Sequence, residues 1–180
     1  VIPSLLNSGL SNLNIWSAGC SSGEEPYTLA MEVEEYKMAN SKSIFDYSIL
    51  ATDVSTKVLE KARNAVYSIN SVKNIPVNIK KKYFFKDNNI ESSEIKVIPE
   101  ICQKVQFQHL NLMDDVFCLK NEMDIIFCRN VLMYFDKTTQ ETVLKKIIKY
   151  LTKGGYLFLG HSETIYNMNL PLKMVAPTIF

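Results

Sequence analysis

Short apolar runs that end in small or polar residues alternate along this chain with segments of helical periodicity. Residues 13–18 (LNIWSA) and 47–52 (YSILAT) are typical of buried strands, and residues 26–38 between them repeat apolar side chains at helical spacing. Ser55 is a suitable N-cap for a further helix, whose apolar face consists of Val58, Leu59, Ala62 and Val66. This order of strand, helix, strand and helix predicts an α/β fold on a parallel sheet with right-handed crossovers.

The middle of the chain departs from this alternation. Residues 76–83 are expected to form a short helix with Lys80, Lys81 and Lys82 on a solvated face. Residues 84–85 and 95–98 then alternate apolar and polar side chains around the turn-forming run Asp87-Asn88-Asn89, which predicts an antiparallel hairpin. This excursion occupies about residues 84–104 and leads into a third sheet strand at residues 105–108.

Two more strands, at residues 123–128 and 156–159, are expected to flank a helix. Thr138 and Glu141 have the spacing of a capping box, and Gly154-Gly155 is a typical helix terminator. The apolar stripe of this helix consists of Val143, Leu144, Ile147, Ile148 and Leu151. The sheet would then have five strands.

Composition excludes several classes of protein. Apolar residues make up 47% of the chain and charged residues 22%, which is enough apolar surface for a core and excludes intrinsic disorder. The net charge of +1 predicts no nucleic-acid binding, and the lack of a run of ~18 apolar residues predicts no insertion into a membrane. The start at Val1 has no signal-peptide pattern, so we expect a fragment of a longer protein. Four cysteines without a C-x-x-C pair are expected to be buried thiols in the reducing cytoplasm.

Ligands of open α/β sheets bind outside the carboxyl ends of the strands, so the polar residues that follow each strand are the candidates for a site. They are residues 19–25, Asp53, Asn111, Arg129 with Asn130, and residues 161–163. The first of these loops contains only two glycines, and Glu24 and Glu25 would repel a pyrophosphate at the helix N-terminus, which disfavours NAD and FAD. Alternatively, the two carboxylates only complement the helix dipole.

Each of the other candidates also has a structural interpretation. Asp53 stands where a ribose-binding acid stands in nucleoside-binding units, or it caps the next helix. Arg129 follows a buried strand, so it lines a site or forms an ion pair at the strand end. From composition alone, Tyr134 and Phe135 are expected to pack, and His161 to be a hydrogen-bonded loop histidine.

Four stretches resemble one known family, in family order over nearly the whole chain. They are residues 16–27 (WSAGCSSGEEPY), residues 51–53 with 58–63 (ATD and VLEKAR), residues 127–136 (FCRNVLMYFD) and residues 160–163 (GHSE). The family is that of the chemotaxis receptor methyltransferases (CheR), which methylate receptor glutamates with S-adenosylmethionine. The resemblance implies a Rossmann-like methyltransferase sheet with an inserted antiparallel β-subdomain at about residues 84–104, which touches the receptor.

The resemblance also implies roles for particular residues. Tyr134 and Arg129 are the implied catalytic residues, with Tyr134 near the transferred methyl group, and Asp53 is placed at the ribose of the cofactor. The implied cofactor-binding residues are Ala18, Glu25, Asp53, Asn111, Leu112, Arg129 and Asn130. The family's partner is the cytoplasmic domain of a methyl-accepting receptor. Two features depart from the family, since its N-terminal helical domain is absent here and the subdomain turn lacks the Arg and Gly of members that dock on a receptor tether.

A glutamate carboxylate, with a pKa of ~4.3, is already ionised at neutral pH and can attack a sulfonium methyl without a general base. Attack joins an anion to a cation, so alignment and exclusion of water are expected to supply most of the acceleration. No metal-binding or Ser-His-Asp pattern is evident. Two alternatives remain, namely a nucleotide-dependent oxidoreductase on a similar sheet and a catalytically weak module that binds the cofactor or a receptor.

Overall fold

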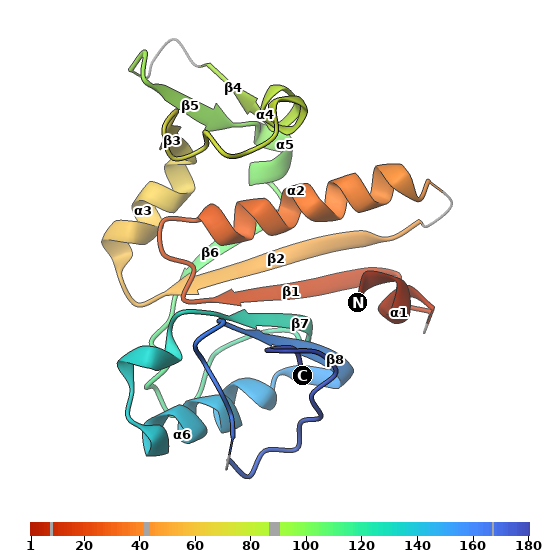
Figure 1. Ribbon diagram of the computed structural model, residues 1–180, viewed down its shortest axis with the longest axis vertical. Helices are drawn as coiled ribbons and strands as arrows, with labels where there is room; N and C mark the ends of the chain where they lie inside the picture. The colour runs from red at the N-terminus through yellow and green to blue at the C-terminus, as the bar shows by residue number, and fades with distance from the viewer. Residues whose placement is uncertain (8, 42–43, 87–90, 167) are drawn as a thin grey trace.

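The structure, a computed structural model, describes residues 1–7, 9–41, 44–86, 91–166 and 168–180. A five-stranded parallel sheet forms its centre, in the order β6-β2-β1-β7-β8 (Figure 1). The strands are β1 (Asn12–Ala18), β2 (Asp46–Asp53), β6 (Val105–His109), β7 (Met123–Cys128) and β8 (Leu151–Leu159). The predicted α/β fold with a Rossmann-like parallel sheet is confirmed. At the carboxyl end of the chain, the Leu157 amide donates to the Phe180 carbonyl at 2.8 Å, so the last residues return along β8.

The side chains of β1 alternate between two apolar cores, one on each face of the sheet. Leu13 and Ile15 point into the core covered by the long helix α2 (Glu24–Ala39), while Trp16 points into the core covered by α6 (Lys137–Ile148). All three side chains are at most 2% exposed, as expected of a central strand that is covered on both faces. The remaining helices are α1 (Ile2–Leu6), α3 (Thr56–Asn64), α4 (Val77–Tyr83), α5 (Pro99–Cys102) and a 3₁₀ turn, η1 (Leu132–Tyr134). No helix in the described ranges is long and apolar enough to cross a membrane.

A second, antiparallel sheet of three strands lies beyond α2, away from the main sheet (Figure 1). Its strands are β3 (Val66–Ser68), β5 (Glu94–Val97) and β4 (Phe84–Phe85), in the order β3-β5-β4. The pairing of β4 with β5 confirms the predicted hairpin, although its turn at residues 87–89 lies outside the described residues. Strand β3 was not predicted, and the placement of Val66 on the preceding helix is wrong. Ala65 adopts a left-handed conformation, with φ of 54°, which ends α3 at Asn64 and redirects the chain into β3.

The helix before the last strand also differs from prediction at both ends. Its N-cap is Asp136, whose Oδ1 accepts from the Thr139 amide at 2.9 Å, so the capping box of Thr138 and Glu141 is wrong. The helix ends at Ile148, and Gly154-Gly155 does not terminate it.

Residues expected in the last turn of that helix, or just after it, belong to β8 (Leu151–Leu159) instead. Leu151 pairs with Met123, and Tyr156 pairs with Ile125, which leaves an irregularity in β8 between the two pairs. Gly154 lies in this irregularity with φ of 83°, a conformation that glycine adopts without strain. The glycines therefore permit a bulge within a strand, where the sequence pattern indicates a helix end.

The cap of α6 gives a prediction about stability and pH. The Thr139 backbone amide, and then its hydroxyl, hold the pKa of Asp136 below its usual value. A carboxyl whose pKa is lowered on folding stabilises the protein above its unfolded-state pKa, and this contribution disappears as the pH falls through the folded-state pKa. We expect Asp136→Ala to lower the Tm at neutral pH but not in acid below that pKa, in thermal melts followed by circular dichroism. Thr138→Ala, the matched control, should leave the Tm unchanged. A larger decrease in Tm for Thr138→Ala than for Asp136→Ala would show that Thr138, and not Asp136, caps the helix.

Candidate functional site

A cavity of about 430 Å³ lies at the carboxyl ends of the strands. Its walls come from four loops, with lining residues Gly19 and Ser21 after β1, Asp53 and Val54 at the end of β2, residues 110–112 after β6, and Asn130, Val131, Tyr134 and Phe135 after β7. Strand order reverses between β1 and β7, because β2 and β6 lie on one side of β1 while β7 and β8 lie on the other. The cavity therefore occupies the topological switch point, where α/β sheets bind ligands, and its volume is within the ~300–1,000 Å³ typical of small-molecule sites.

Asp53 joins two loops at one edge of this cavity. Its Oδ2 accepts from the Ser21 amide at 2.9 Å, and its Oδ1 accepts from the Ser55 amide at 2.9 Å. Ser55 occupies the N-cap position of α3, but its side chain makes no capping bond. Asp53 therefore forms the turn that leads into α3, and its role at a ribose stays a prediction. Each carboxylate oxygen is used once and can accept a further hydrogen bond from a ligand.

The loop after β6 contributes an apolar wall with one amide group. Leu110 and Leu112 are buried, and both line the cavity together with Asn111. The side-chain oxygen Oδ1 of Asn111 accepts from the Met113 backbone amide at 3.0 Å, whereas its side-chain nitrogen has no partner among the described residues. A flat heteroaromatic ring with polar edges fits such a wall, since its faces can contact the leucines while an edge meets the amide.

Glu25 and Arg129 meet beside the cavity although 104 positions separate them in the chain. Arg129 Nη1 donates to Glu25 Oε2 at 3.2 Å, and the buried Ser17 hydroxyl donates to Glu25 Oε1 at 2.8 Å. Arg129 therefore forms an ion pair at the strand end, which was one of its two interpretations. Neither side chain lines the cavity itself, and Ala18 is buried in the core on the α6 side. Of the predicted site residues, the structure brings Asp53, Asn111, Leu112, Asn130 and Tyr134 together in the cavity wall.

The loop after β7 is bound by Glu163, one of the polar residues after the last strand that were candidates for the site without a specific role. Glu163, only 7% exposed, accepts hydrogen bonds from the backbone amides of four residues. The donors are Asn130 at 3.1 Å, Val131 at 2.9 Å, Leu132 at 2.8 Å and Gly160 at 2.7 Å. The sequence signal for it was a carboxylate four residues after the end of an apolar strand, in the same loop as His161.

The loops after β1 and β7 approach each other closely at Gly19. A Cβ atom at this position would lie 2.3 Å from Cγ2 of Val131, and the backbone has φ of 82°. Only glycine allows both the contact and this conformation without strain. Two walls of the cavity are thus in direct contact.

The structural expectations for Tyr134 and His161 are wrong. Tyr134 was expected to pack, but it is 80% exposed and lies at the cavity rim, because η1 turns it away from the core. Phe135 is half-buried and packs against the core on the α6 side, as expected. His161 was expected to be hydrogen-bonded, yet it is exposed and has no hydrogen-bond partner among the described residues. Of the lysines expected to be solvated, Lys82 pairs with Glu35 on α2.

The cysteines near the cavity are not nucleophiles at neutral pH. Burial, followed by the nearby Asp53 carboxylate, raises the pKa of Cys20 to about 12. Burial also raises the pKa of Cys128, at the end of β7. Both thiols therefore stay protonated, and the deprotonated form is the one that attacks electrophiles. All four cysteines are free, but the expectation that all are buried is wrong, since Cys102 is half-buried and Cys118 is exposed.

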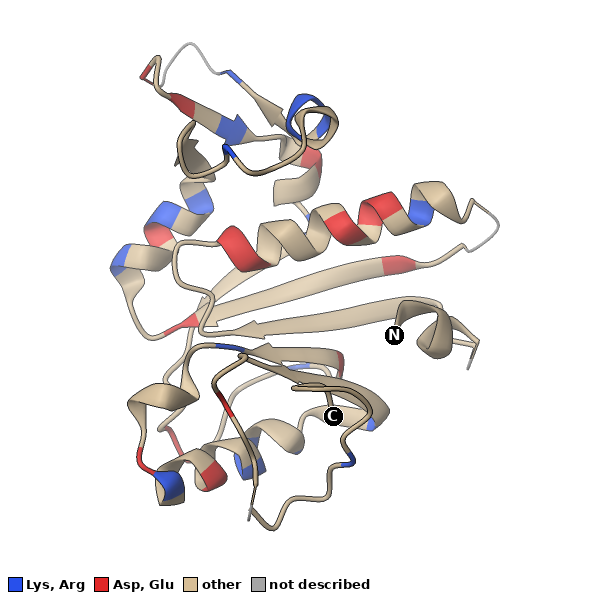
Figure 2. Cartoon of the chain, in the orientation of Figure 1, with Lys and Arg blue, Asp and Glu red and all other residues tan. Residues whose placement is uncertain are grey.

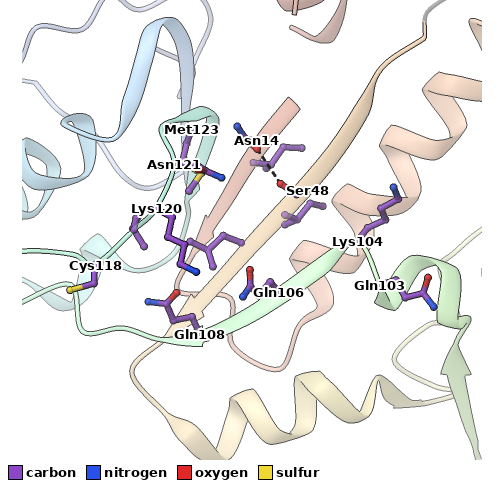
Figure 3. Close-up of a pocket in the computed structure, with 14 residues that line it drawn as sticks. Asn14, Ser48, Gln103, Lys104, Gln106, Gln108, Cys118, Lys120, Asn121 and Met123 are labelled. Carbon is purple, nitrogen blue, oxygen red and sulfur yellow. Dashed lines mark hydrogen bonds between the residues drawn. The ribbon is translucent and has the colours of Figure 1, made fainter. Parts of the chain in front are cut away.

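A second hollow, of about 260 Å³, lies on the face of β1, β2 and β6 (Figure 3). Its polar lining consists mainly of amides and hydroxyls, such as Asn14, Ser48, Gln106 and Gln108, and the Ser48 hydroxyl donates to Asn14 Oδ1 at 3.1 Å. Its lining in the described part of the chain contains no carboxylate. A ligand with a cationic centre and vicinal hydroxyls therefore fits the cavity at the strand ends better than this hollow.

Comparison with known proteins gives the family of this chain. The family model described as "CheR methyltransferase, SAM binding domain" matches residues 1–180. The chain is 45% identical over 173 residues to the chemotaxis protein methyltransferase of Borreliella burgdorferi, covering 96% of this chain and 60% of that protein. It is 35% identical over 170 residues to chemotaxis protein methyltransferase 2 of Pseudomonas aeruginosa, covering 93% and 59%. The chain thus spans about three-fifths of the length of these relatives.

Solved structures show the same fold at low sequence identity. The glycopeptide N-methyltransferase MtfA complexed with sinefungin superposes with a TM-score of 0.50 at 11% identity, covering 88% of this chain and 47% of that one. PKMT2 from Rickettsia typhi superposes with a TM-score of 0.50 at 16% identity, covering 82% and 20%. With a family model matched along its whole length, this chain belongs to the CheR methyltransferases, as their S-adenosylmethionine-binding domain.

Proposed function

We propose that the protein transfers the methyl group of S-adenosylmethionine to glutamate side chains of chemotaxis receptors, in the cytoplasm. The observation that carries the proposal is the cavity at the switch point, where the Asp53 carboxylate faces the apolar and amide wall of residues 110–112. The family match and the relatives named as chemotaxis methyltransferases support it. Free thiols at all four cysteines support a reducing compartment.

The residues around the cavity fit the chemistry of S-adenosylmethionine. Asp53 would accept from the two ribose hydroxyls, and Asn111 with Leu112 would contact the adenine. Glu25, at the start of α2, would attract the cationic end of the cofactor, and Asn130 would contact it from the cavity wall. Ala18 and Arg129, which lie outside the cavity lining, are proposed as further contacts at its edge. When bound, the cofactor supplies an electrophilic methyl group on a sulfonium centre.

The chain's own part in the reaction is orientation rather than proton transfer. The acceptor is a glutamate carboxylate, whose pKa of ~4.3 leaves it ionised at neutral pH, so no base is required. Because charge is neutralised as the carboxylate oxygen bonds to the methyl carbon and the carbon–sulfur bond breaks, a dry and aligned site favours the transition state. Tyr134, exposed at the rim, would hold the receptor carboxylate or shape the path to the methyl group.

The first test measures binding and transfer. Calorimetry should show that the protein binds S-adenosylmethionine and S-adenosylhomocysteine and does not bind NADH, since Glu24 and Glu25 disfavour a pyrophosphate. The full-length protein should transfer labelled methyl to receptor-containing membranes, and mild alkali should release the label because a glutamate methyl ester hydrolyses. NADH binding would favour the oxidoreductase alternative, while binding without transfer would favour a non-catalytic module.

The second test concerns Asp53. We expect Asp53→Ala to weaken S-adenosylhomocysteine binding more than tenfold, because hydrogen bonds to a charged acceptor are worth ~1.5–3 kcal/mol, or roughly one to two decades of affinity. Asp46→Ala is the matched control, since Asp46 lies at the opposite end of β2 and pairs with Lys104 at 2.7 Å. Equal affinities of a folded Asp53→Ala variant and the wild type for S-adenosylhomocysteine would show that Asp53 does not bind the cofactor.

The third test separates the two interpretations of Arg129. Its partly exposed pair with Glu25 should contribute only ~0–1 kcal/mol to stability, so Arg129→Ala should lower the Tm little. If Arg129 also borders the cofactor, the variant should weaken S-adenosylhomocysteine binding or slow transfer by a much larger factor. Lys145→Ala, which breaks the pair with Glu141 on α6, serves as control. A drop in Tm with unchanged binding and transfer would leave Arg129 as an ion-pair partner alone.

A further inference from the structure

We propose that Glu163 is a positioning residue, whose buried carboxylate holds the loop after β7 in the conformation that forms one wall of the cavity. The inference deepens the proposed function, on which it rests for the identity of the ligand. Glu163 itself does not line the cavity, so it acts through the residues that it holds.

The geometry is that of a carboxylate enclosed by amides from two segments. Oε1 accepts from Val131 and Leu132, while Oε2 accepts from Asn130 and Gly160. Three consecutive amides of the β7 loop therefore converge on one side chain, and the fourth donor ties the same carboxylate to the end of β8. Among the described residues, no buried side-chain nitrogen or oxygen lacks a partner, so this cluster is fully satisfied.

Convergence of three amides requires an unusual backbone. Asn130 has φ of 59°, an uncommon left-handed conformation that asparagine adopts more readily than other non-glycine residues. Gly160 leaves no room for a side chain, since a Cβ there would lie 2.8 Å from Glu163 Oε2 and 3.0 Å from the Asn130 nitrogen. The carboxylate and the two backbones are thus packed in direct contact.

The held loop is the part of the chain that matters to the site. Asn130, Val131 and Tyr134 line the cavity, and Val131 also fills the space beside Gly19. If the three amides lose their acceptor, the loop can relax from the left-handed conformation, and Val131 and Tyr134 move with it. We therefore expect a change at Glu163 to reach the ligand through the cavity wall.

The chain offers a matched control in Asp124, at the other end of β7. Asp124 is 4% exposed, its Oδ2 accepts from the Asn14 amide at 2.8 Å, and its Oδ1 accepts from the Thr152 hydroxyl at 3.3 Å. It is likewise a buried carboxylate that ties neighbouring strands together, but it is remote from the cavity. Replacing each acid by its amide removes the same charge, and the amide NH₂ that replaces one oxygen cannot accept from a backbone N–H.

The experiment compares Glu163→Gln with Asp124→Asn in the full-length protein. Both variants should lower the Tm. Well below either Tm, Glu163→Gln should weaken S-adenosylhomocysteine binding more than tenfold and speed hydrogen exchange of the amides of residues 130–132, whereas Asp124→Asn should change neither. Because a merely stabilising role would affect both variants alike, this contrast is specific to positioning.

The outcomes separate the inference from the proposed function. Wild-type affinity and wild-type exchange at residues 130–132 in folded Glu163→Gln would overturn the positioning role. If the wild-type protein does not bind S-adenosylhomocysteine, the proposed function fails, and the exchange measurement still decides whether Glu163 holds the loop. If Glu163→Gln does not fold, Gly160→Ala disturbs the same cluster while keeping the carboxylate, and the same loss of affinity and faster exchange are expected. Unchanged values in Gly160→Ala would then overturn the role.

Discussion

The parallel pairing of β1 with both β2 and β7 is the constraint on which the rest of the structure depends. Ser17 lies opposite Ala51 on one side and opposite Phe127 on the other, so the carboxyl ends of three strands come to the same edge of the sheet. The next side chain back, Trp16, is fully buried, and its indole nitrogen donates to the Thr52 hydroxyl at 2.9 Å. Because β1 is rigidly held on both faces and both edges, the loops that follow these strands have a fixed base.

Carboxylates then join these loops to one another. Asp53 accepts from amides in two loops, Glu25 accepts from the strand end at Ser17 and from Arg129, and Glu163 accepts from four amides. The distribution of charge in Figure 2 shows acidic residues at the carboxyl ends of the strands as well as on the outer helices. Preformed hydrogen bonds of this kind hold a site in one geometry before a ligand arrives. Such order suits a reaction whose barrier is lowered by alignment and exclusion of water.

Much of the fold could be predicted from the sequence, because the evidence for it is local. Four of the five strands of the main sheet were placed within about a residue of their observed bounds by apolar runs that end in small or polar residues. Two of the wrong boundaries share one physical cause. Val66 and Leu151 fit the apolar faces of the helices to which they were assigned. In the structure, however, Val66 pairs with β5 and Leu151 pairs with β7, so both residues belong to strands. Pairing between segments that are distant in the sequence overrides the local apolar pattern, and that pattern does not show which segments pair.

The same division holds for the site. The residue types at the strand ends, and the resemblance that they carry, already indicated a cofactor bound at the carboxyl edge of the sheet. Which of them line the cavity was decided only by the tertiary structure, which places Asp53, Asn111 and Tyr134 in the wall and joins Glu25 to Arg129 beside it. The sequence indicated that Glu163 follows a strand, but not what it binds, since three of its four donors are backbone amides about 30 positions away. Backbone amides carry no residue-specific signal, so the sequence determined the chemistry available at the edge of the sheet, and only the fold determined which donors and acceptors meet there.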